Sequence, residues 1–389
     1  MNAQICMTSN KKKIQDQNIF FCVLAAFFPL GSSIGVTIAW GVLPLVAITF
    51  TLLNSRVIYT KGLVLFFLFF IVLCINYIIV VQYVDYKERI NINLILSLVG
   101  CFYFCVCFFS SSFTIDKLKR AIDLTLSINV LFFLIQFISY YVLNFYLDYS
   151  RLSGGFGARN FHDTLFRASG IFNEPAEYSS AIICLISIRY LLGGYINKRG
   201  YLSLVTVAMS FSIVGIIQVF CFLFLVNIKK IFRQPMFIFV MIGCLLLLVA
   251  CFNDYLLQRY QLFIMGGDGS NNTKIDTINY FLQNPKYLYG GAGLMGYDLF
   301  KMPLFFQGLY DLTFWGANIT IFGVFGGLVI NILFLFFLIR NFSFQKILII
   351  MLCLLKINVM IYASYWFFIL SLIMIVDFNK KNNYERRIY

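Results

Sequence analysis

Ionisable side chains gather in one polar stretch of the chain, residues 148–174, which lies between two long apolar runs. The stretch contains Arg151, Arg159, His162, Asp163, Arg167 and Glu174. Arginine binds phosphate through a planar fork of N–H donors, and a carboxylate can take a proton from an attacking hydroxyl. Because charges are costly close to hydrocarbon, this stretch is a candidate site for anion binding and proton transfer.

The composition of the chain is that of an integral membrane protein. Of the 389 residues, 61% are hydrophobic and 12% are charged, whereas soluble domains carry roughly 25% charged residues. The apolar residues form blocks close to the roughly 20 residues that cross a bilayer. The formal net charge of +14 comes mainly from short loops between these blocks. Basic loops are an orientation signal in membrane proteins, so no nucleic-acid partner is expected.

The cysteines and the amino terminus narrow the class further. Nearly all of the 11 cysteines lie inside apolar blocks, and none lies in the two long polar loops. We therefore expect neither a disulfide framework nor a metal site in an aqueous segment. Three lysines at 11–13 precede the first apolar block without a small-residue cleavage site, which predicts an uncleaved membrane anchor.

The apolar blocks predict an all-α, polytopic membrane domain that comprises residues 1–389. The blocks are 18–32, 35–53, 62–82, 94–113, 122–147, 175–192, 201–227, 236–252, 315–339 and 346–376. Two of them, 201–227 and 346–376, have basic residues at both ends, although a single crossing cannot return to the side that it left. Each of these two is expected to be a broken or re-entrant hairpin, with breaks at 210–215 and 358–364. The total is then about twelve membrane segments, with both termini cytoplasmic.

Two long loops, 148–174 and 253–314, then fall outside the membrane, and together they are expected to form the active site. In the second loop, Ser270 or Asn271 should cap a helix from Asn272 to Gln283. Its apolar positions Ile275, Ile278 and Leu282 share one face, which would rest on the membrane or on the first loop.

A glycine-rich run, residues 289–296, follows that helix. Glycines at this density allow close approach of the backbone to a ligand, although most such runs are simple turns. Both roles are left open.

The motif Arg167-Ala168-Ser169-Gly170-Ile171-Phe172-Asn173-Glu174-Pro175 ends the first loop and leads into an apolar block. It resembles the O-antigen polymerase family (Wzy-type), which belongs to a wider group with the O-antigen ligases. Weaker similarities follow in the family's order: a serine-rich segment at 210–215, Arg259 at the start of the second loop, the glycine run, and a glycine-rich segment at 323–326. The resemblance covers the chain from about residue 150 onward.

The chain also departs from its apparent relatives. Lys274 stands where relatives often carry an arginine, which keeps the positive charge but loses the bidentate fork. The ligases are expected to carry a histidine in the late outer loop, whereas this chain has none after His162. This difference favours a polymerase over a ligase.

The resemblance implies a glycosyltransferase in the bacterial cytoplasmic (inner) membrane. A growing glycan would pass from undecaprenyl diphosphate to a lipid-linked repeat unit at the outer face. The donor's energy lies in its diphosphate ester, so no cofactor and no metal are expected. The implied partners are the undecaprenyl-diphosphate-linked oligosaccharide, membrane lipid, a chain-length regulator and a flippase.

Glu174 and Arg167 are the candidate catalytic residues, the first as general base and the second as a ligand of the departing diphosphate. Each has a structural alternative, because a residue before Pro175 can cap a helix and an arginine can anchor to headgroups. Four further cations are candidate diphosphate ligands: Arg151, Arg159, Arg259 and Lys274. His162 is expected to be solvated or structural, and Glu177 to complement the helix dipole.

Two other functional classes are weighed. A lipid-linked oligosaccharide flippase or other transporter should have charges along several helices and internal repeats. Here the charges inside blocks are few, with Lys356 the clearest. A structural or adaptor membrane protein needs no constellation of arginine and glutamate.

Overall fold

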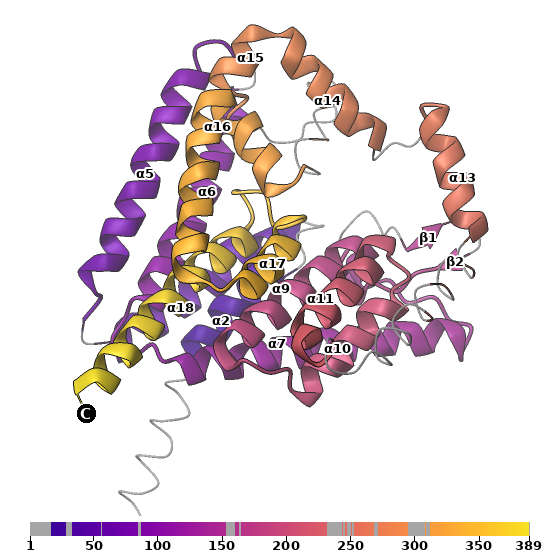
Figure 1. Cartoon of the computed structure of the whole chain (residues 1–389), viewed down its shortest axis with the longest axis horizontal. Coiled ribbons are helices and arrows are strands. Elements are labelled where there is room, and N and C mark those ends of the chain that lie inside the picture. Colours follow the sequence, from indigo (N-terminus) through magenta and orange to yellow (C-terminus); the bar gives the residue numbers. More distant parts are fainter. Residues whose placement is uncertain are drawn as a thin grey trace, which may run out of the picture. The chain divides into compact units, whose positions relative to one another are not determined.

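The computed structural model describes residues 17–28, 33–55, 57–84, 87–152, 160–162, 165–231, 243, 246, 250, 253–267, 271–294, 308 and 312–388. Helices dominate the described part (Figure 1). Its strands are one antiparallel pair of two residues each, β1 (Phe161–His162) and β2 (Leu165–Phe166). The predicted all-α class is confirmed.

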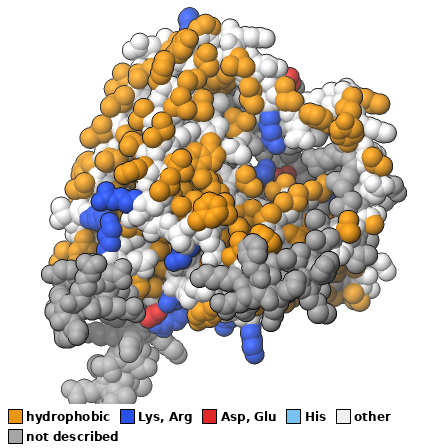
Figure 2. All heavy atoms as spheres, in the orientation of Figure 1, with side chains coloured by type: hydrophobic (Ala, Val, Ile, Leu, Met, Phe, Trp, Pro, Cys, Tyr) orange, Lys and Arg blue, Asp and Glu red, His pale blue; other side chains and the backbone are white. Residues whose placement is uncertain are grey.

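Seven helical stretches of the described part are long and apolar enough to cross a membrane. They are Ile34–Asn54, Thr60–Val80, Lys87–Phe108, Ile115–Tyr141, Pro175–Gly193, Phe314–Asn341 and Ala363–Lys380. Hydrophobic side chains cover much of the outward face of α5 (Thr60–Val80) and α16 (Phe314–Asn341) in Figure 2. These helices support an integral membrane protein, whereas the expected count of about twelve segments stays a prediction. Block 236–252 lies almost wholly outside the described residues.

The chain forms two compact units, which are described separately. The first comprises residues 1–74, 94–219 and 360–389, and the second comprises residues 75–93 and 220–359. Helices α5 and α6 (Lys87–Phe108) therefore each contribute to both units.

The first unit is built around α9 (Pro175–Gly193), in which every residue from 178 to 191 is buried. Four helices pack directly or at one remove around it: α2 (Gln17–Ala26), α7 (Ile115–Tyr141), α10 (Lys198–Met209) and α18 (Ala363–Ile388). The chain from α2 continues through α3 (Ser33–Thr37), η1 (Ile38–Val42) and α4 (Leu43–Asn54), and α4 packs on α2. Protein neighbours thus surround α9, which explains how its serines, Arg189 and Tyr178 are accommodated in a helix of membrane length.

The two expected helix breaks are confirmed. Helix α10 ends at Met209, and α11 (Ile213–Ile231) begins after Phe211, whose φ is +52°. The second break falls at residues 355–362, between α17 (Phe344–Leu354) and α18, slightly earlier than expected. Lys356 therefore lies in this connection rather than inside a helix. The path of these segments through a membrane stays a prediction.

A third break, in α16, was not expected within the predicted span at 315–339. Gly323 has φ +73° and ψ 171° inside α16. Asn318 Nδ2 donates to Asn331 Oδ1 at 2.8 Å, and Asn331 Nδ2 donates to the carbonyl oxygen of Trp315 at 3.0 Å. Thirteen residues of straight helix would separate the two asparagines by about 20 Å along its axis. The segment before Gly323 therefore folds back against the segment after it.

The second loop contains three helices of the second unit. They are α13 (Asn253–Ile264), α14 (Asn271–Gln283) and α15 (Pro285–Gly290). The predicted helix at 272–283 is confirmed as α14, which starts one residue earlier. Pro285 occupies the first turn of α15 and so does not extend α14.

Candidate functional site

A buried glutamine on α7 fixes both ends of the first loop. Gln136 Nε2 donates to the carbonyl oxygen of Leu147 at 3.0 Å, where the loop begins. Its Oε1 accepts from the backbone N–H groups of Ser169 and Gly170, both at 2.8 Å, where the loop ends. Gln136 and Ser169 are fully buried, so the two hydrogen bonds to Ser169 and Gly170 satisfy groups that water does not reach. One side chain therefore closes the loop.

The strand pair supplies a second tie. The backbone N–H of Arg167 donates to the carbonyl oxygen of Asn160 at 2.7 Å. This contact continues the register in which Phe161 pairs with Phe166, so Asn160 and Arg167 lie opposite each other. The Ser169 hydroxyl is 2.8 Å from Asn160 Oδ1 and 2.7 Å from the carbonyl oxygen of Phe172. Its single proton serves one of these two acceptors at a time.

Aromatic rings line the base of the loop. Phe166 stacks on Tyr140 with ring centroids 4.1 Å apart, and its carbonyl oxygen accepts from the Tyr141 hydroxyl at 2.6 Å. Tyr146 donates to Asp148 at 3.3 Å. Burial first, and then the charge and hydrogen bond of Asp148, raise the pKa of Tyr146 to about 12. This phenol therefore stays protonated at neutral pH.

Arg167 follows β2 and is half-buried. Its Nε is buried and has no hydrogen-bond partner in the described part of the chain. A buried guanidinium N–H without an acceptor is unfavourable, whereas an anionic ligand would supply the missing acceptor. The backbone of Arg167 is thus fixed by Asn160, while its side-chain Nε remains able to donate a hydrogen bond to a ligand.

Glu174 is the N-cap residue of α9, with φ −146° and ψ 153°, and Pro175 takes the first helical position as expected. Its side chain makes no capping hydrogen bond. Glu174 therefore stands at the N-cap without a side-chain capping hydrogen bond, and its negative charge complements the helix dipole. Its two alternative roles, general base and cap, stay predictions. Its carboxylate is half-buried and has no ion pair among the described residues, so it can serve as a proton acceptor.

Of the other first-loop candidates, only Arg151 is described in full. It is exposed, lies in the short α8 (Tyr149–Leu152), and its Nε is 3.4 Å from Asp148 Oδ2. Arg159 and Asp163 lie outside the described residues, as does the side chain of His162. Glu177 is exposed in the first turn of α9, where a negative charge is favourable.

The second-loop candidates belong to the other unit. Lys274 lies in α14 and is half-buried, and Arg259 lies in α13, with its side chain outside the description. The prediction that Arg259 and Lys274 bind the diphosphate together with the first loop stays a prediction.

The glycine-rich run binds the chain's own backbone. The N–H groups of Ala292 and Gly293 donate to the carbonyl oxygens of Thr320 and Ile321 at 2.7 and 3.0 Å. These carbonyls precede the break at Gly323, where the helix cannot satisfy them. A Cβ on Gly291 would lie 2.2 Å from the carbonyl oxygen of Ile321, so only glycine permits this approach.

Three side chains add hydrogen bonds to this contact, one to α16 and two to the glycine-rich run. Asn76 Nδ2 donates to the carbonyl oxygen of Ile321 at 2.9 Å, and Asn93 Nδ2 donates to that of Leu294 at 2.7 Å. The Tyr83 hydroxyl donates to the carbonyl oxygen of Gly291 at 2.6 Å. Burial raises the pKa of Tyr83 to about 12, so this donor keeps its proton. Between its two open roles, the run at 290–293 serves structure.

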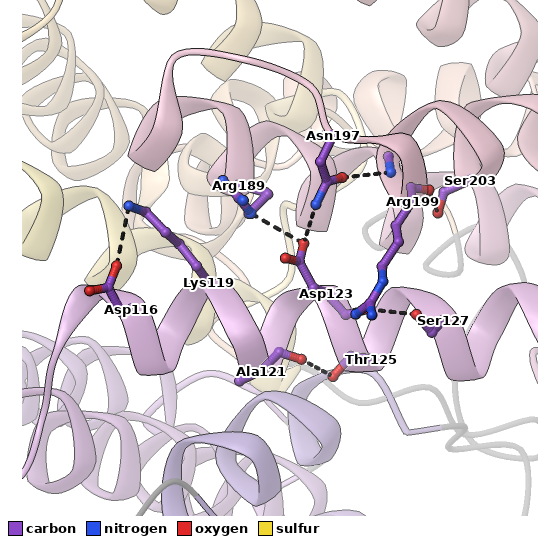
Figure 3. Close-up of polar contacts among 11 residues, drawn as sticks. Asp116, Lys119, Ala121, Asp123, Thr125, Ser127, Arg189, Asn197, Arg199 and Ser203 are labelled. Carbon is purple, nitrogen blue, oxygen red and sulfur yellow. Dashed lines mark hydrogen bonds and ion pairs between the residues drawn. The ribbon is translucent and has the colours of Figure 1, made fainter.

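A polar cluster on α7, α9 and α10 is also structural (Figure 3). Asp123 Oδ1 accepts from Arg189 Nε at 3.1 Å and from Asn197 Nδ2 at 2.9 Å. The Asn197 side chain in turn caps α10 by accepting from the N–H of Gly200 at 2.8 Å. Asp123 and Arg189 thus form an ion pair, although Arg189 Nη1 has no hydrogen-bond partner in the described part of the chain. Arg167 and Glu174 have no ion pair among the described residues.

The sequence analysis did not predict that Gln136 and Asn160 bind the backbone of the first loop. The available signal for Gln136 was a lone amide in an apolar block, which must find partners when it is buried. Asn160 carried no signal, because its role depends on a two-residue strand pair. Among the described residues, no group of three His, Cys, Asp or Glu side chains could hold a metal ion.

The described geometry therefore fixes both ends of the first loop next to the start of the buried helix α9, while Arg167 and Glu174 keep groups that can bind a ligand. The chain matches no protein-family model and no curated protein.

Proposed function

We propose that the chain is a polysaccharide polymerase of the O-antigen polymerase type, acting at the outer face of the bacterial cytoplasmic membrane. The observation that carries the proposal is the contrast within the 160–175 segment. Its backbone is bound by Gln136 and Asn160, while Arg167 Nε and the Glu174 carboxylate have no partner in the described part of the chain. Preorganised groups of this kind suit charge that develops during a reaction.

In the proposed reaction, a sugar hydroxyl of the lipid-linked acceptor attacks the anomeric carbon of the donor glycan. The new glycosidic C–O bond forms as the bond from the anomeric carbon to the diphosphate oxygen breaks. Glu174 takes the hydroxyl proton, and undecaprenyl diphosphate leaves with the bonding electron pair. Arg167 stabilises the charge that grows on the diphosphate. Arg151, Arg159, Arg259 and Lys274 are proposed as further diphosphate ligands.

A glycan profile of a deletion strain tests this proposal. If the chain is a polymerase, long surface glycans disappear while a single repeat unit remains attached to its acceptor. Loss of all attachment would instead identify a ligase or a flippase. The partners proposed with this function are a flippase and a chain-length regulator, and genes for both beside this one would agree with it.

The proposed topology, with loops 148–174 and 253–314 outside and both termini inside, has its own test. Cysteines introduced at Ser153 and Asn272 should react with a membrane-impermeant reagent in intact cells. Labelling that requires permeabilised cells would contradict an outer active site.

A lipid-linked oligosaccharide transporter is the second candidate, and the helix breaks favour it. Transporters commonly bind substrate where membrane helices are interrupted. In this chain, however, the freed carbonyls at Thr320 and Ile321 are already bound by Ala292, Gly293 and Asn76. Glycan profiling separates the two functions, because a transporter deletion removes single repeat units from the outer face as well.

A further inference from the structure

One side of α14 is anchored at the end of a membrane span. Phe281 is buried in a cluster with Val80, which is the last residue of α5, and with Val84, Ile90 and Ala292. Tyr287 closes the cluster, with its ring centroid 5.8 Å from that of Phe281 and 5.9 Å from that of Tyr83. Thr277, one turn before Phe281, is also buried. Helix α14 is therefore packed firmly where α5 ends.

This contact fixes the depth of α14. Helix α5 has 21 residues, and its most apolar 18-residue stretch has a mean hydropathy of 3.0, with only 17% of that stretch buried inside the protein. At about 1.5 Å per residue its length matches the roughly 30 Å of a hydrocarbon core. Because Val80 is its last residue, the side chains that pack on Val80 lie where hydrocarbon gives way to headgroups.

A neighbouring side of α14, about 110° around the helix axis from Thr277 and Phe281, is apolar and exposed. Ile275, Ile278 and Leu282 are 44%, 46% and 62% exposed, and their spacing places them on one face. Helix α13 repeats the same spacing with Leu257, Tyr260 and Ile264, which are 52%, 61% and 65% exposed. We call these six residues the paired stripes. Six large apolar side chains exposed to this extent on two helices indicate that lipid or another protein covers them.

We propose that α13 and α14 lie in the interface of the bilayer that the chain spans, with the paired stripes inserted among the lipids. An amphipathic helix held at that depth buries its apolar face below the headgroups. Figure 1 shows α14 running obliquely to α16, as an interfacial helix does relative to a span of the same unit.

Neighbouring residues of the same unit favour lipid as the occupant. Tyr289 of α15 stacks on Phe325 of α16 with ring centroids 5.8 Å apart, and both rings are exposed. Phe325 opens the apolar second part of α16, where Leu328, Val329 and Ile332 are also exposed. Tyrosine is favoured at the membrane interface. The exposed Lys286, in the first turn of α15, suits lipid phosphate.

This inference stands apart from the proposed catalytic role, because it depends only on packing and exposure in the second unit. It has one consequence for that role. An interfacial α13 and α14 hold positions 259 and 274 at the depth of lipid phosphates, whichever reaction the chain carries out.

Fluorescence quenching in lipid bilayers tests the proposal. A small fluorescent amino acid is placed by codon suppression at one position of the full chain at a time, at 275, 276, 278, 279, 282 and 283. The protein is reconstituted into phosphatidylcholine–phosphatidylglycerol bilayers with or without bromine on the acyl chains. We expect bromine to quench emission strongly at 275, 278 and 282, less at 279, which borders the stripe, and weakly at 276 and 283, with the period of roughly 3.6 residues of a helix.

Two other outcomes would overturn the proposal. Equal, weak quenching at all six positions by bromine, with strong quenching by a soluble iodide salt, would mean that α14 projects into water. Protection of the stripe from both quenchers would mean that protein covers it, such as a second copy of the chain.

A variant pair guards against misfolding as an explanation. The double substitution Ile275→Glu with Ile278→Glu should abolish lipid quenching of a probe at 282, because two charges now oppose insertion. Asn279→Glu, on the adjacent polar side of the helix, should leave that quenching unchanged. Both proteins must elute from size exclusion as the wild type does. Unchanged quenching in the well-folded double variant would contradict lipid insertion of the stripe.

Discussion

Two segments of the molecule, one in each unit, use their polar groups in opposite ways. In the connection from Arg167 to Glu174, neutral groups carry the structure: Gln136 binds two backbone N–H groups, and Asn160 binds a third. In the run from Gly290 to Leu294, the backbone N–H groups of Ala292 and Gly293 donate to carbonyl oxygens of the broken α16. The first segment leaves the charged groups of Arg167 and Glu174 able to bind a ligand, whereas the second leaves few polar groups for one.

This difference shows why a glycine-rich run and an arginine–glutamate motif deserve different weight as candidate sites. Glycine permits close approach, but the approaching group can be the chain's own carbonyl, as with Gly291 and Ile321. A charged side chain whose neighbours are already satisfied by neutral groups has no such internal partner. A segment is therefore a candidate site to the extent that its hydrogen-bonding and charged groups lack partners within the folded chain.

We expect the largest effect of a single substitution at the break in α16, where it should reduce the stability of the fold. Gly323→Ala should prevent normal folding, because a Cβ there would lie 2.0 Å from the carbonyl oxygen of Tyr289 and the φ of +73° disfavours alanine. We expect a loss of more than about 3 kcal/mol of stability. The measurement is the yield of monodisperse protein after solubilisation and its thermal unfolding midpoint.

Gly316→Ala in the same helix is the matched control. A Cβ at this position would meet its nearest neighbour, Leu312 Cβ, at 3.4 Å, which is ordinary contact. Alanine also favours helix over glycine by about 1 kcal/mol, so this variant should be as stable as the wild type or more so. Equal behaviour of the two variants would contradict the structural role of Gly323.

The next effect concerns Arg167. Arg167→Ala should remove long glycans, a loss of activity on the order of 10²- to 10³-fold, because a donor to the developing diphosphate charge is lost. Arg167→Lys should recover only part of it, since lysine lacks the bidentate fork. The readout is the glycan ladder on a gel at matched membrane levels of the protein. Wild-type chain lengths from Arg167→Ala would mean that this arginine has no part in the reaction.

Much of the fold was predictable from hydrophobic blocks and breaks. The ends at Met209 and Leu354 followed from the mismatch between basic flanks and a single crossing, and α14 followed from its cap and period. The break at Gly323 did not, because hydropathy is continuous across residues 314–341. Its cause is an interaction with residues 291–293, and long-range pairing of this kind leaves no local signal.

The candidate site divides in the same way. The motif from Arg167 to Pro175 marked the helix start correctly, because proline at the first helical position is a local preference. The role of Gln136 could not be read, since its partners at Leu147, Ser169 and Gly170 depend on how the loop closes. The sequence also could not separate a cap from a base at Glu174, because a carboxylate before a helix suits both roles.

Glu174→Gln separates the remaining roles of that carboxylate. Gln keeps the size and one acceptor oxygen but removes the charge and the basicity. If Glu174 takes the acceptor proton, polymer formation should fall by roughly a hundredfold. If the charge only complements the dipole of α9, the change should cost about 1 kcal/mol or less of local stability and leave the ladder normal. A normal ladder would remove Glu174 from the catalytic role and direct attention to Glu177 or Asp163.

The smallest expected effect, and the one that tests how the loop is held, is at Gln136. Gln136→Met keeps the side-chain volume but removes the partner of three backbone groups, of which the N–H groups of Ser169 and Gly170 are buried. The connection from Arg167 to Glu174 should loosen, and activity should fall by roughly tenfold, since small misplacements of reacting groups are costly. Faster proteolysis of the loop, with thermal unfolding of the rest unchanged, would distinguish loosening from global misfolding.

Gln136→Glu sharpens this test through pH. A protonated glutamic acid can reproduce the amide, because its O–H donates to the carbonyl of Leu147 while its other oxygen accepts from Ser169 and Gly170. The protonated form, which makes all three hydrogen bonds, is present at low pH. As pH rises, the carboxyl ionises and loses the O–H that donates to the carbonyl of Leu147. Loop protection should accordingly be near wild type in mild acid and decline with rising pH in this variant, whereas in Gln136→Met it should stay low throughout. A pH-independent Gln136→Glu profile would mean that Gln136 does not hold the loop by these hydrogen bonds.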